Sequence, residues 1–324
     1  MEIIPNPMKK FNTPVLLITF NRPDVTRRVL DRILEMDPPL LYFFNDAPRP
    51  GNEKDAEMCA EIRKMAEEIS FSGELKTRFE THNLGCKMGE STAMSWLFEN
   101  EEMGIVIEDD IFPSLDFFWY CEEMLEKYKD DPRVFSITGC NLIDQWKQDI
   151  QDYHFALSGS FWGWAGWKRV WKLYDVDLNC WKNPEIQRLV INYLPSEQYR
   201  KLRRNEFNAI LDSSISTWDF QFCMIHYLYH GLSVVPARNM IENIGTNRDD
   251  AVHMTGESTF ANLRHLDVVL PMKDNPHLIP DLEYEDLVLR RAYPWLYEEP
   301  SPPVVSQPPG IPERIIRKVK KWAS

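Results

Sequence analysis

The sequence lacks the features that mark several common classes of protein. No apolar run approaches the roughly 20 residues of a membrane-spanning helix, and Met1 to Phe11 lacks the basic start and apolar stretch of a secretory signal. The six cysteines include no Cys-x-x-Cys pair, which argues against a zinc ribbon and gives no support to a disulfide framework. A formal net charge of −13 disfavours nucleic acid as the main partner, because binding to phosphate backbones relies on a basic surface. We therefore expect a cytosolic protein with reduced thiols.

Two glycine-rich phosphate-binding motifs are also absent. No Gly-x-Gly-x-x-Gly follows the first apolar run, and no Gly-x-x-x-x-Gly-Lys-Ser/Thr occurs anywhere. The first motif would indicate a dinucleotide site and the second a P-loop, where backbone amides hold the phosphates. A metal ion is therefore the more plausible holder of a phosphate-bearing ligand.

What the sequence does contain is an alternation of strand and helix patterns. Apolar runs at 14–20, 40–44, 75–80, 104–107 and 134–138 alternate with helical periodicity at 25–34, 53–69, 88–99 and 114–128. Asp24 is the expected N-cap of the first helix. This order predicts right-handed βαβ crossovers and an α/β fold with a mainly parallel sheet flanked by helices. At 324 residues, the chain can form one large domain or two closely packed halves, the first of them residues 1–140.

Polar loops follow three of these predicted strands. Asn21-Arg22, Asn45-Asp46 and Glu108-Asp109-Asp110 each come directly after an apolar run. Ligands of open α/β sheets bind outside the carboxyl ends of the strands, so the three loops are expected to converge on one site.

Glu108, Asp109 and Asp110 place three carboxylates side by side at the end of a strand. Like charges repel and are costly to bury, so the triplet calls for a counter-charge. Hard cations such as Mn²⁺ and Mg²⁺ take oxygen ligands, commonly one or two carboxylates together with substrate phosphates. The triplet is thus either a metal-diphosphate anchor or an acidic turn solvated by water, and taken alone it favours neither.

The second half, residues 141–297, is rich in aromatic residues. Four tryptophans lie in the segment 158–171 among small residues, and most are expected to be core, with Trp164 the candidate for lining the ligand site. Helices are expected at 186–193 and 197–211, another over 217–230 with Gly231 as its C-cap, and a strand at 233–236. Asp219 is an isolated carboxylate among large apolar residues, which suits a general base but also an ordinary acid at a helix N-terminus.

Three further features allow more than one interpretation. His226 and His230 are one helical turn apart, but no Glu follows His226 and no third ligand is marked, so two ordinary histidines are favoured over zinc. The polar segment 243–256 resembles a flexible lid. Residues 298–324 form a proline-rich linker and a basic amphipathic tail, in which Arg314 to Trp322 is either a peripheral contact with an anionic membrane or a solvated terminus.

Several motifs together resemble the GT-A type nucleotide-diphospho-sugar glycosyltransferases, in particular the N-acetylglucosaminyltransferase I-like family and its bacterial relatives. The resemblance covers residues 13–256. It rests on Phe20-Asn21-Arg22-Pro23, on Asn83-Leu84-Gly85-Cys86-Lys87-Met88-Gly89, on Ile107-Glu108-Asp109-Asp110 followed by Pro113 to Phe118, and on Trp162-Gly163-Trp164-Ala165-Gly166-Trp167.

The resemblance implies that residues 1–140 are the nucleotide-sugar-binding half and residues 141–297 the acceptor-binding half of one domain. It also implies a role for each matched residue. Asp110 would be the direct ligand of Mn²⁺ or Mg²⁺, Asp109 would contact the ribose, and Glu108 would face the transferred sugar. Other nucleotide contacts would come from Arg22, Asp46 and Lys87, where this chain has lysine in place of the animal enzyme's histidine. Trp218-Asp219 resembles the family's Trp-Asp-Asp motif, although only one Asp follows the Trp here, and would supply the catalytic base. His253 would cap the diphosphate.

The implied activity is metal-dependent, inverting transfer of a sugar from a UDP-sugar to a hydroxyl of a glycan or glycolipid, as in bacterial surface polysaccharide synthesis. Two alternatives remain open. A sugar-phosphate nucleotidyltransferase can use a related sheet and metal, but usually needs a glycine-rich basic loop where this chain has Asn21-Arg22-Pro23-Asp24. A non-catalytic carbohydrate-binding protein can keep the same fold.

Overall fold

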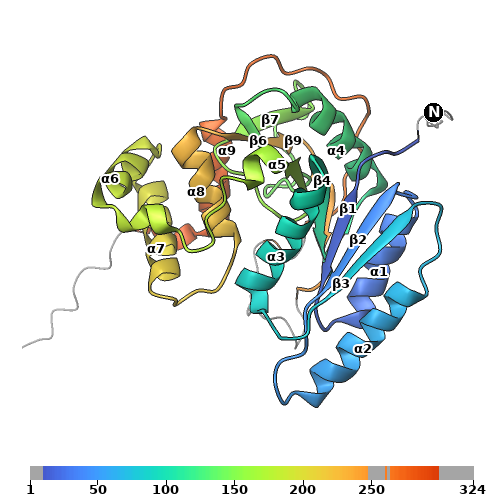
Figure 1. The fold of residues 1–324 in the computed structure, drawn as a ribbon. Helices are drawn as coiled ribbons and strands as arrows, with labels where there is room; N and C mark the ends of the chain where they lie inside the picture. Colours follow the sequence, from blue (N-terminus) through green and yellow to red (C-terminus); the bar gives the residue numbers. More distant parts are fainter. Residues whose placement is uncertain (1–9, 247–259, 261–262, 299–324) are drawn as a thin grey trace, which may run out of the picture.

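A twisted mixed sheet forms the centre of the protein (Figure 1). The computed structural model describes residues 10–246, 260 and 263–298. Within these residues, eight strands form the main sheet in the order β3-β2-β1-β4-β8-β6-β9-β7. Their bounds are β1 Val15–Thr19, β2 Leu40–Asn45, β3 Glu74–Phe79, β4 Met103–Glu108, β6 Val134–Thr138, β7 Tyr153–Ala156, β8 Trp164–Trp167 and β9 Leu232–Pro236. A second, two-stranded sheet pairs β5 Ile111–Pro113 with β10 Ile241–Asn243.

The pairing within the main sheet is mostly parallel. Strands β3, β2, β1 and β4 run parallel to one another, and β6 runs parallel to β9. Strand β8 lies antiparallel between β4 and β6, and β7 lies antiparallel to β9. The predicted α/β fold with a mainly parallel sheet is therefore confirmed. The antiparallel β8 was not predicted, because a short run that is apolar at every position has no alternation that would distinguish a strand from a helix.

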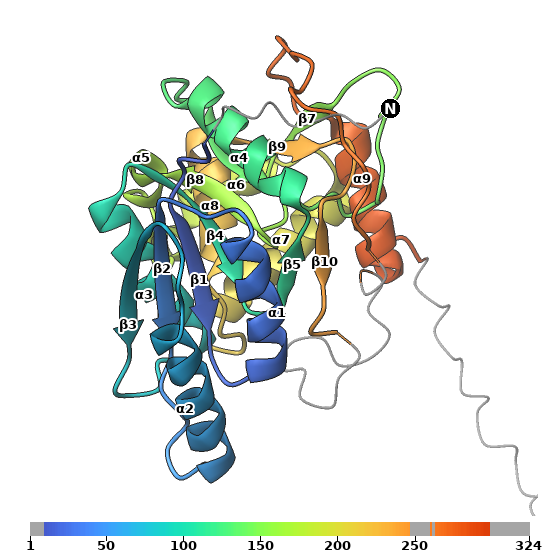
Figure 2. The ribbon, with the colours of Figure 1, turned by 90° about the vertical axis from the view of Figure 1, so that its right-hand side faces the viewer.

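Helices cover both faces of the parallel half. Figures 1 and 2 show α1 (Pro23–Leu34) and α2 (Glu53–Glu67) on one face and α3 (Gly85–Asn100) on the opposite face. On α1, the residues Val25, Val29 and Ile33 are buried at helical spacing, as the sequence pattern predicts. The expected N-cap is wrong: α1 begins at Pro23, Arg22 stands at the N-cap position, and Asp24 lies in the first turn. The fixed φ of proline favours the first helical position, so the helix begins at Pro23, earlier in the chain than expected.

The remaining helices belong mainly to the second half. They are α4 Leu115–Tyr128, α5 Lys168–Trp171, α6 Pro184–Tyr193, α7 Glu197–Leu211, α8 Asp219–Tyr229 and α9 Leu282–Ala292, with short 3-10 helices η1 Asn179–Lys182 and η2 Pro294–Leu296. Helix α9 was not predicted. The C-cap expected at Gly231 is also wrong, because His230 adopts the left-handed conformation with φ 54°. Gly231 instead lies where a Cβ would come within 2.2 Å of the Phe135 ring, so packing accounts for the glycine.

Most of the cysteines, together with His154 and His226, are buried in the core. All six cysteines are free thiols, and four of them are buried. His226 is fully buried and its Nε2 lies 3.1 Å from the Ser136 hydroxyl, whereas His230, the other histidine of the pair, is exposed at the end of α8. No helix in the described part of the chain is both long and apolar enough to cross a membrane.

Candidate functional site

The polar loops after β1 and β4 meet at one edge of the sheet. The two strands are adjacent and parallel, with Ile18 opposite Glu108, so the residues that follow them lie side by side. The Arg22 guanidinium reaches across from the β1 loop and pairs with both Asp109 and Asp110. Its Nη1 donates to Asp110 Oδ2 at 2.8 Å, and its Nη2 donates to Asp109 Oδ1. The first counter-charge of the acidic triplet is therefore an arginine of the chain itself.

Asp109 is the more deeply buried of the two carboxylates that pair with Arg22. Asp109 is 3% exposed and also accepts a hydrogen bond from the Phe20 backbone amide at 3.3 Å. Burial raises the pKa of Asp109, and Arg22 offsets part of that rise. Burial lowers the pKa of Arg22, but the two carboxylates outweigh this effect and raise it, so Arg22 stays charged. The pair fixes the orientation of the β1 and β4 loops.

The small sheet of β5 and β10 closes over Asp110. The chain turns at Asp109 and Asp110 into β5, and the Ile244 amide donates to the Asp110 carbonyl at 2.8 Å. This brings Gly245 so close that a Cβ there would lie 2.4 Å from Asp110 Oδ2 and 2.8 Å from Arg22 Nη1. Only a residue without a side chain fits over the ion pair without displacing it. Sequence reasoning missed this role of Gly245, because the pairing of β10 with β5 is not visible in the local pattern.

A second group of carboxylates faces the triplet from α3 and α8. Burial raises the pKa of Glu108 well above its ordinary value, with further contributions from Glu90 and from the carboxylates of Asp110, Asp109 and Asp219. Burial likewise raises the pKa of Glu90 to about 8, and Asp219 and Asp110 add to the rise. Carboxylates from other elements thus add to the burial that raises the pKa values of Glu108 and Glu90, and we call Glu90, Glu108, Asp109, Asp110 and Asp219 the carboxylate cluster. Such concentrated negative charge is typical of sites that bind a cation or move protons.

Glu90 was not singled out from the sequence, although a signal was present. It lies on α3, and the residues three, four and seven positions later, Ala93, Met94 and Leu97, are all buried. An acid on the buried stripe of an amphipathic helix calls for a partner or a function. The family resemblance instead assigns a nucleotide contact to Lys87, three residues earlier.

Asp219 is the first residue of α8. Its Oδ1 accepts from the Thr217 hydroxyl at 2.5 Å and from the Phe220 amide at 3.0 Å. Burial raises the pKa of Asp219, which the hydrogen bond from Thr217 partly offsets. Asp219 occupies a helix N-terminus, as one interpretation of the sequence expects, and it also belongs to the carboxylate cluster; its role as a general base stays a prediction.

Asp46 joins the end of β2 to the start of α3. Its carboxylate accepts from the Ala47 amide at 2.8 Å, from Asn83 Nδ2 at 3.0 Å, and from the amides of Leu84 and Gly85 at 3.0 Å each. Burial raises its pKa, and the backbone hydrogen bonds, led by that from Leu84, oppose the rise. With its oxygens occupied, Asp46 holds the α3 terminus beside the site, and its contact with a nucleotide stays a prediction.

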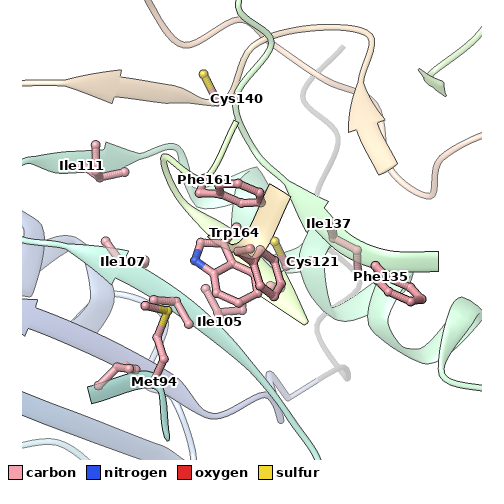
Figure 3. Packing of buried hydrophobic residues seen from close by; sticks show 14 of the residues in the cluster. Met94, Ile105, Ile107, Ile111, Cys121, Phe135, Ile137, Cys140, Phe161 and Trp164 are labelled. Atoms are coloured by element: carbon pink, nitrogen blue, oxygen red, sulfur yellow. The ribbon is translucent and has the colours of Figure 1, made fainter. Parts of the chain in front are cut away.

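Lys87 and Trp164, two other predicted ligand contacts, have partners elsewhere in the chain. Lys87 Nζ lies 3.5 Å from Asp177 Oδ1 on the α3 surface. Trp164 is 1% exposed and sits on β8 at the centre of the core, between Ile105 and Phe161 (Figure 3). Its ring centroid lies 5.8 Å from that of Trp218, so Trp164 packs against the residue that precedes Asp219 and does not line an open site. His253 lies outside the described residues.

The donor set at this edge fits a hard divalent cation. Among the described residues, no three His, Cys, Asp or Glu side chains lie close enough to hold a metal ion by themselves. A cation held by one or two carboxylates and completed by substrate phosphates needs no such cluster. Asp110 can serve as that ligand, because its side chain is 14% exposed and only its Oδ2 is engaged by Arg22 in the described structure.

Comparisons with known proteins give distant structural likenesses. No protein-family model and no curated protein matches the sequence. The fold is similar to a mannosyltransferase from Pyrobaculum calidifontis in complex with GDP-Man and Mn²⁺, with 13% identity, 71% of this chain and 72% of that chain covered, and a TM-score of 0.39. It is also similar to mouse xyloside xylosyltransferase 1, with 10% identity, 68% and 82% covered, and a TM-score of 0.33.

A third similar structure is 4-diphosphocytidyl-2C-methyl-D-erythritol synthase from Anaerococcus prevotii. It shares 9% identity over 67% of this chain and 98% of that chain, with a TM-score of 0.30. Likenesses at these identities and TM-scores carry no conclusion about activity, which therefore rests on the site itself.

Proposed function

We propose that the protein is a metal-dependent, inverting glycosyltransferase that moves a sugar from a nucleotide-diphospho-sugar, a UDP-sugar, to a hydroxyl of a glycan or glycolipid. The observation that carries the proposal is the pairing of Arg22 with Asp109 and Asp110 at the carboxyl ends of β1 and β4, where burial and the charges of Asp110 and Asp219 raise the pKa of Glu108. Open α/β sheets bind ligands at this edge. The resemblance of the Asp-rich and Trp-Asp motifs gives these residues their roles.

The chain's own residues divide the work of such a transfer. Asp219 accepts the proton of the attacking hydroxyl, because a partly buried carboxylate with a raised pKa is a stronger base than an exposed one. Glu108 faces the transferred sugar, and Asp109, held by Arg22 and the Phe20 amide, contacts the ribose. A divalent cation held by Asp110 and the donor phosphates would stabilise the negative charge on the departing diphosphate.

Two substitutions separate binding from catalysis. Asp110→Ala should abolish metal-dependent binding of UDP, measured by calorimetry with and without Mn²⁺, while circular dichroism shows an intact fold. Asp219→Asn should bind UDP as the wild type does but lose transfer to acceptor, measured by release of UDP. Full turnover in purified Asp110→Ala protein would refute the metal site, and equal loss of binding and transfer in Asp219→Asn would make Asp219 structural.

The same measurements address the other two candidate functions. A carbohydrate-binding protein on this fold would bind UDP-sugars without releasing UDP in the presence of any acceptor. A nucleotidyltransferase would release pyrophosphate from a nucleoside triphosphate and a sugar phosphate, and would need a basic residue at the phosphates. Arg22 is paired with two carboxylates, which disfavours that role.

A further inference from the structure

The two carboxylate oxygens of Asp219, the proposed base, lie in different surroundings. Oδ1 accepts from the Thr217 hydroxyl at 2.5 Å and from the Phe220 amide at 3.0 Å. Oδ2 has no hydrogen-bond partner on another residue of the described chain, and it is not one of the buried side-chain oxygens that lack a partner there. Because Asp219 is partly exposed, Oδ2 is the oxygen that an incoming hydroxyl can reach.

The backbone around Thr217 is anchored on two sides. The Gln221 side chain on α8 donates from Nε2 to the Thr217 carbonyl at 2.8 Å and to the Val176 carbonyl at 3.2 Å. The Tyr174 hydroxyl, from the segment before η1, donates to the Trp218 carbonyl at 3.1 Å. These bonds fix the peptide units on both sides of the Thr217–Trp218 linkage, so the Thr217 hydroxyl is kept beside the carboxylate.

The two oxygens can divide the work of a general base. In the proposed transfer, the attacking hydroxyl oxygen bonds to the anomeric carbon, its proton passes to Asp219 Oδ2, and the bond to the diphosphate breaks with its electron pair leaving on the phosphate oxygen. A general base must lie within hydrogen-bond reach of the proton that it removes, so the carboxylate needs a fixed orientation. A donor on Oδ1 supplies that orientation and leaves Oδ2 free.

The Thr217 hydroxyl also affects the proton affinity of the base. Burial raises the pKa of Asp219, and the hydrogen bond from Thr217 is the largest effect that opposes this rise. A hydrogen bond to the charged form of a carboxyl group favours that form. Without the hydroxyl, more of Asp219 would already carry a proton near neutral pH and could not accept another.

Other ionisable groups also act on Asp219. The Arg203 charge on α7 lowers the pKa of Asp219. The remaining groups whose charges interact with that of Asp219 are Cys86 and Glu90 on α3, Glu108 on β4, Tyr174 before η1, Glu206 on α7, Cys223 on α8 and Tyr293 after α9. All of them are retained when only the Thr217 hydroxyl is removed, so a comparison of variants at this position reports on that hydroxyl.

We infer that Thr217 is a positioning residue for the proposed base: its hydroxyl holds Asp219 Oδ1 and leaves Oδ2 to take the proton of the acceptor hydroxyl. The same hydrogen bond keeps the carboxylate charged at neutral pH. This inference rests on the proposed function for the reaction, but the effect of the hydroxyl on the carboxyl group can be measured without any substrate.

The first test removes the hydroxyl and then restores it. Thr217→Val keeps the shape of the side chain without the donor, whereas Thr217→Ser keeps the donor. Loss of the hydrogen bond should raise the pKa of Asp219 by about one unit, which corresponds to about 1.4 kcal/mol. The pKa is measured by NMR on full-length protein labelled with ¹³C at the aspartate carboxyl carbons, with Asp219→Asn identifying the signal.

The second test is the pH dependence of transfer, measured as release of UDP. Activity falls as the base becomes protonated, so the acid limb of the kcat profile should move to higher pH by about one unit in Thr217→Val and return in Thr217→Ser. Ser216→Ala is the matched control, because it removes an exposed hydroxyl from the preceding residue and should change neither measurement.

A purely structural role for Thr217 predicts a different pattern. Stability in urea would fall in Thr217→Val while the Asp219 titration stayed at its wild-type position, and that result overturns the inference. Equal titrations of Thr217→Ser and Thr217→Val overturn it as well, because the hydroxyl would then have no effect. If circular dichroism shows that Thr217→Val does not fold, Thr217→Ala gives the same comparison.

Activity of the wild type separates this inference from the proposed function. If the Asp219 titration moves as expected in Thr217→Val but the wild type releases UDP with no acceptor, the proposed function fails and the hold of Thr217 on the carboxylate stands. If the wild type transfers sugar and neither the titration nor the acid limb moves in Thr217→Val, the proposed function stands and the inference fails.

Discussion

Replacing Gly245 by alanine tests the geometry at the centre of the candidate site. The added methyl group would lie 2.4 Å from Asp110 Oδ2, 2.7 Å from Asp110 Cβ and 2.8 Å from Arg22 Nη1. The contact with Cβ cannot be relieved by rotating the carboxylate alone, because Cβ is fixed to the backbone. The β10 segment and Asp110 must therefore move apart.

The size of the effect follows from these distances. Bringing the 2.4 Å separation to the 3.4 Å of an ordinary contact requires a displacement of about 1 Å. Overpacking of this kind costs about 1–3 kcal/mol of stability, and a displacement of about 1 Å in a reacting group can cost about 100-fold in rate. We expect Gly245→Ala to lower metal-dependent UDP affinity at least tenfold and to lower transfer further.

The assay is calorimetry with UDP and Mn²⁺, together with urea unfolding of the same preparations. Gly89→Ala is the matched control, because a Cβ there would make an ordinary contact of 3.5 Å with Asp46 and because alanine is favoured over glycine within α3. UDP binding by Gly245→Ala that equals the wild type would refute the close approach of β10 to the Arg22–Asp110 pair.

Two further substitutions test buried carboxyl groups. Burial raises the pKa of Glu285 from 4.5 to about 7, so the folded state keeps a proton that the unfolded chain releases, and stability falls as pH rises through this window. In Glu285→Gln, the free energy of unfolding in urea should therefore fall less between about pH 4.5 and 7 than it does in the wild type. Glu283→Gln, at an exposed position, should show the wild-type pH dependence. A wild-type pH dependence in Glu285→Gln would contradict the effect of burial. Asp46→Asn turns an amide N–H₂ toward backbone donors at the α3 terminus and should cost about 1–3 kcal/mol of unfolding free energy, against a small change for Asp177→Asn at the surface. Equal stability of these two variants would show that the Asp46 hydrogen bonds do not hold α3.

The sequence predicts the parallel half of the fold well, because each element there carries its own periodicity. The strand at 40–44 and the helix at 53–69 are found at Leu40–Asn45 and Glu53–Glu67. Strand β8 and the β5–β10 pair are different, because they exist only through pairing with distant parts of the chain. Nothing in Trp164–Trp167 indicates that β4 and β6 lie on its two sides.

The candidate site likewise has residues that the sequence pattern predicts and contacts that depend on the tertiary structure. Glu108, Asp109 and Asp110 could be found because they are consecutive in the sequence and follow an apolar run. The pairing of Arg22 with two of them and the approach of Glu90 depend on the order of strands and on the face of α3, which are tertiary properties. Trp164 was expected beside the ligand, but full burial on both sides of a central strand makes it a core residue.

The position of β8 has a consequence for how the chain reaches its folded state. Strand β4 is paired with β1 on one side, and on the other side its partner is β8, which is made about 60 residues later in the chain. Until that segment is available, the first four strands have an unpaired edge at β4, next to the acidic triplet. Open edges of this kind recruit other chains and lead to aggregation. A fragment ending near residue 140 should therefore be insoluble, and a ribosome-bound chain would need protection at β4 until Trp164–Trp167 is inserted beside it.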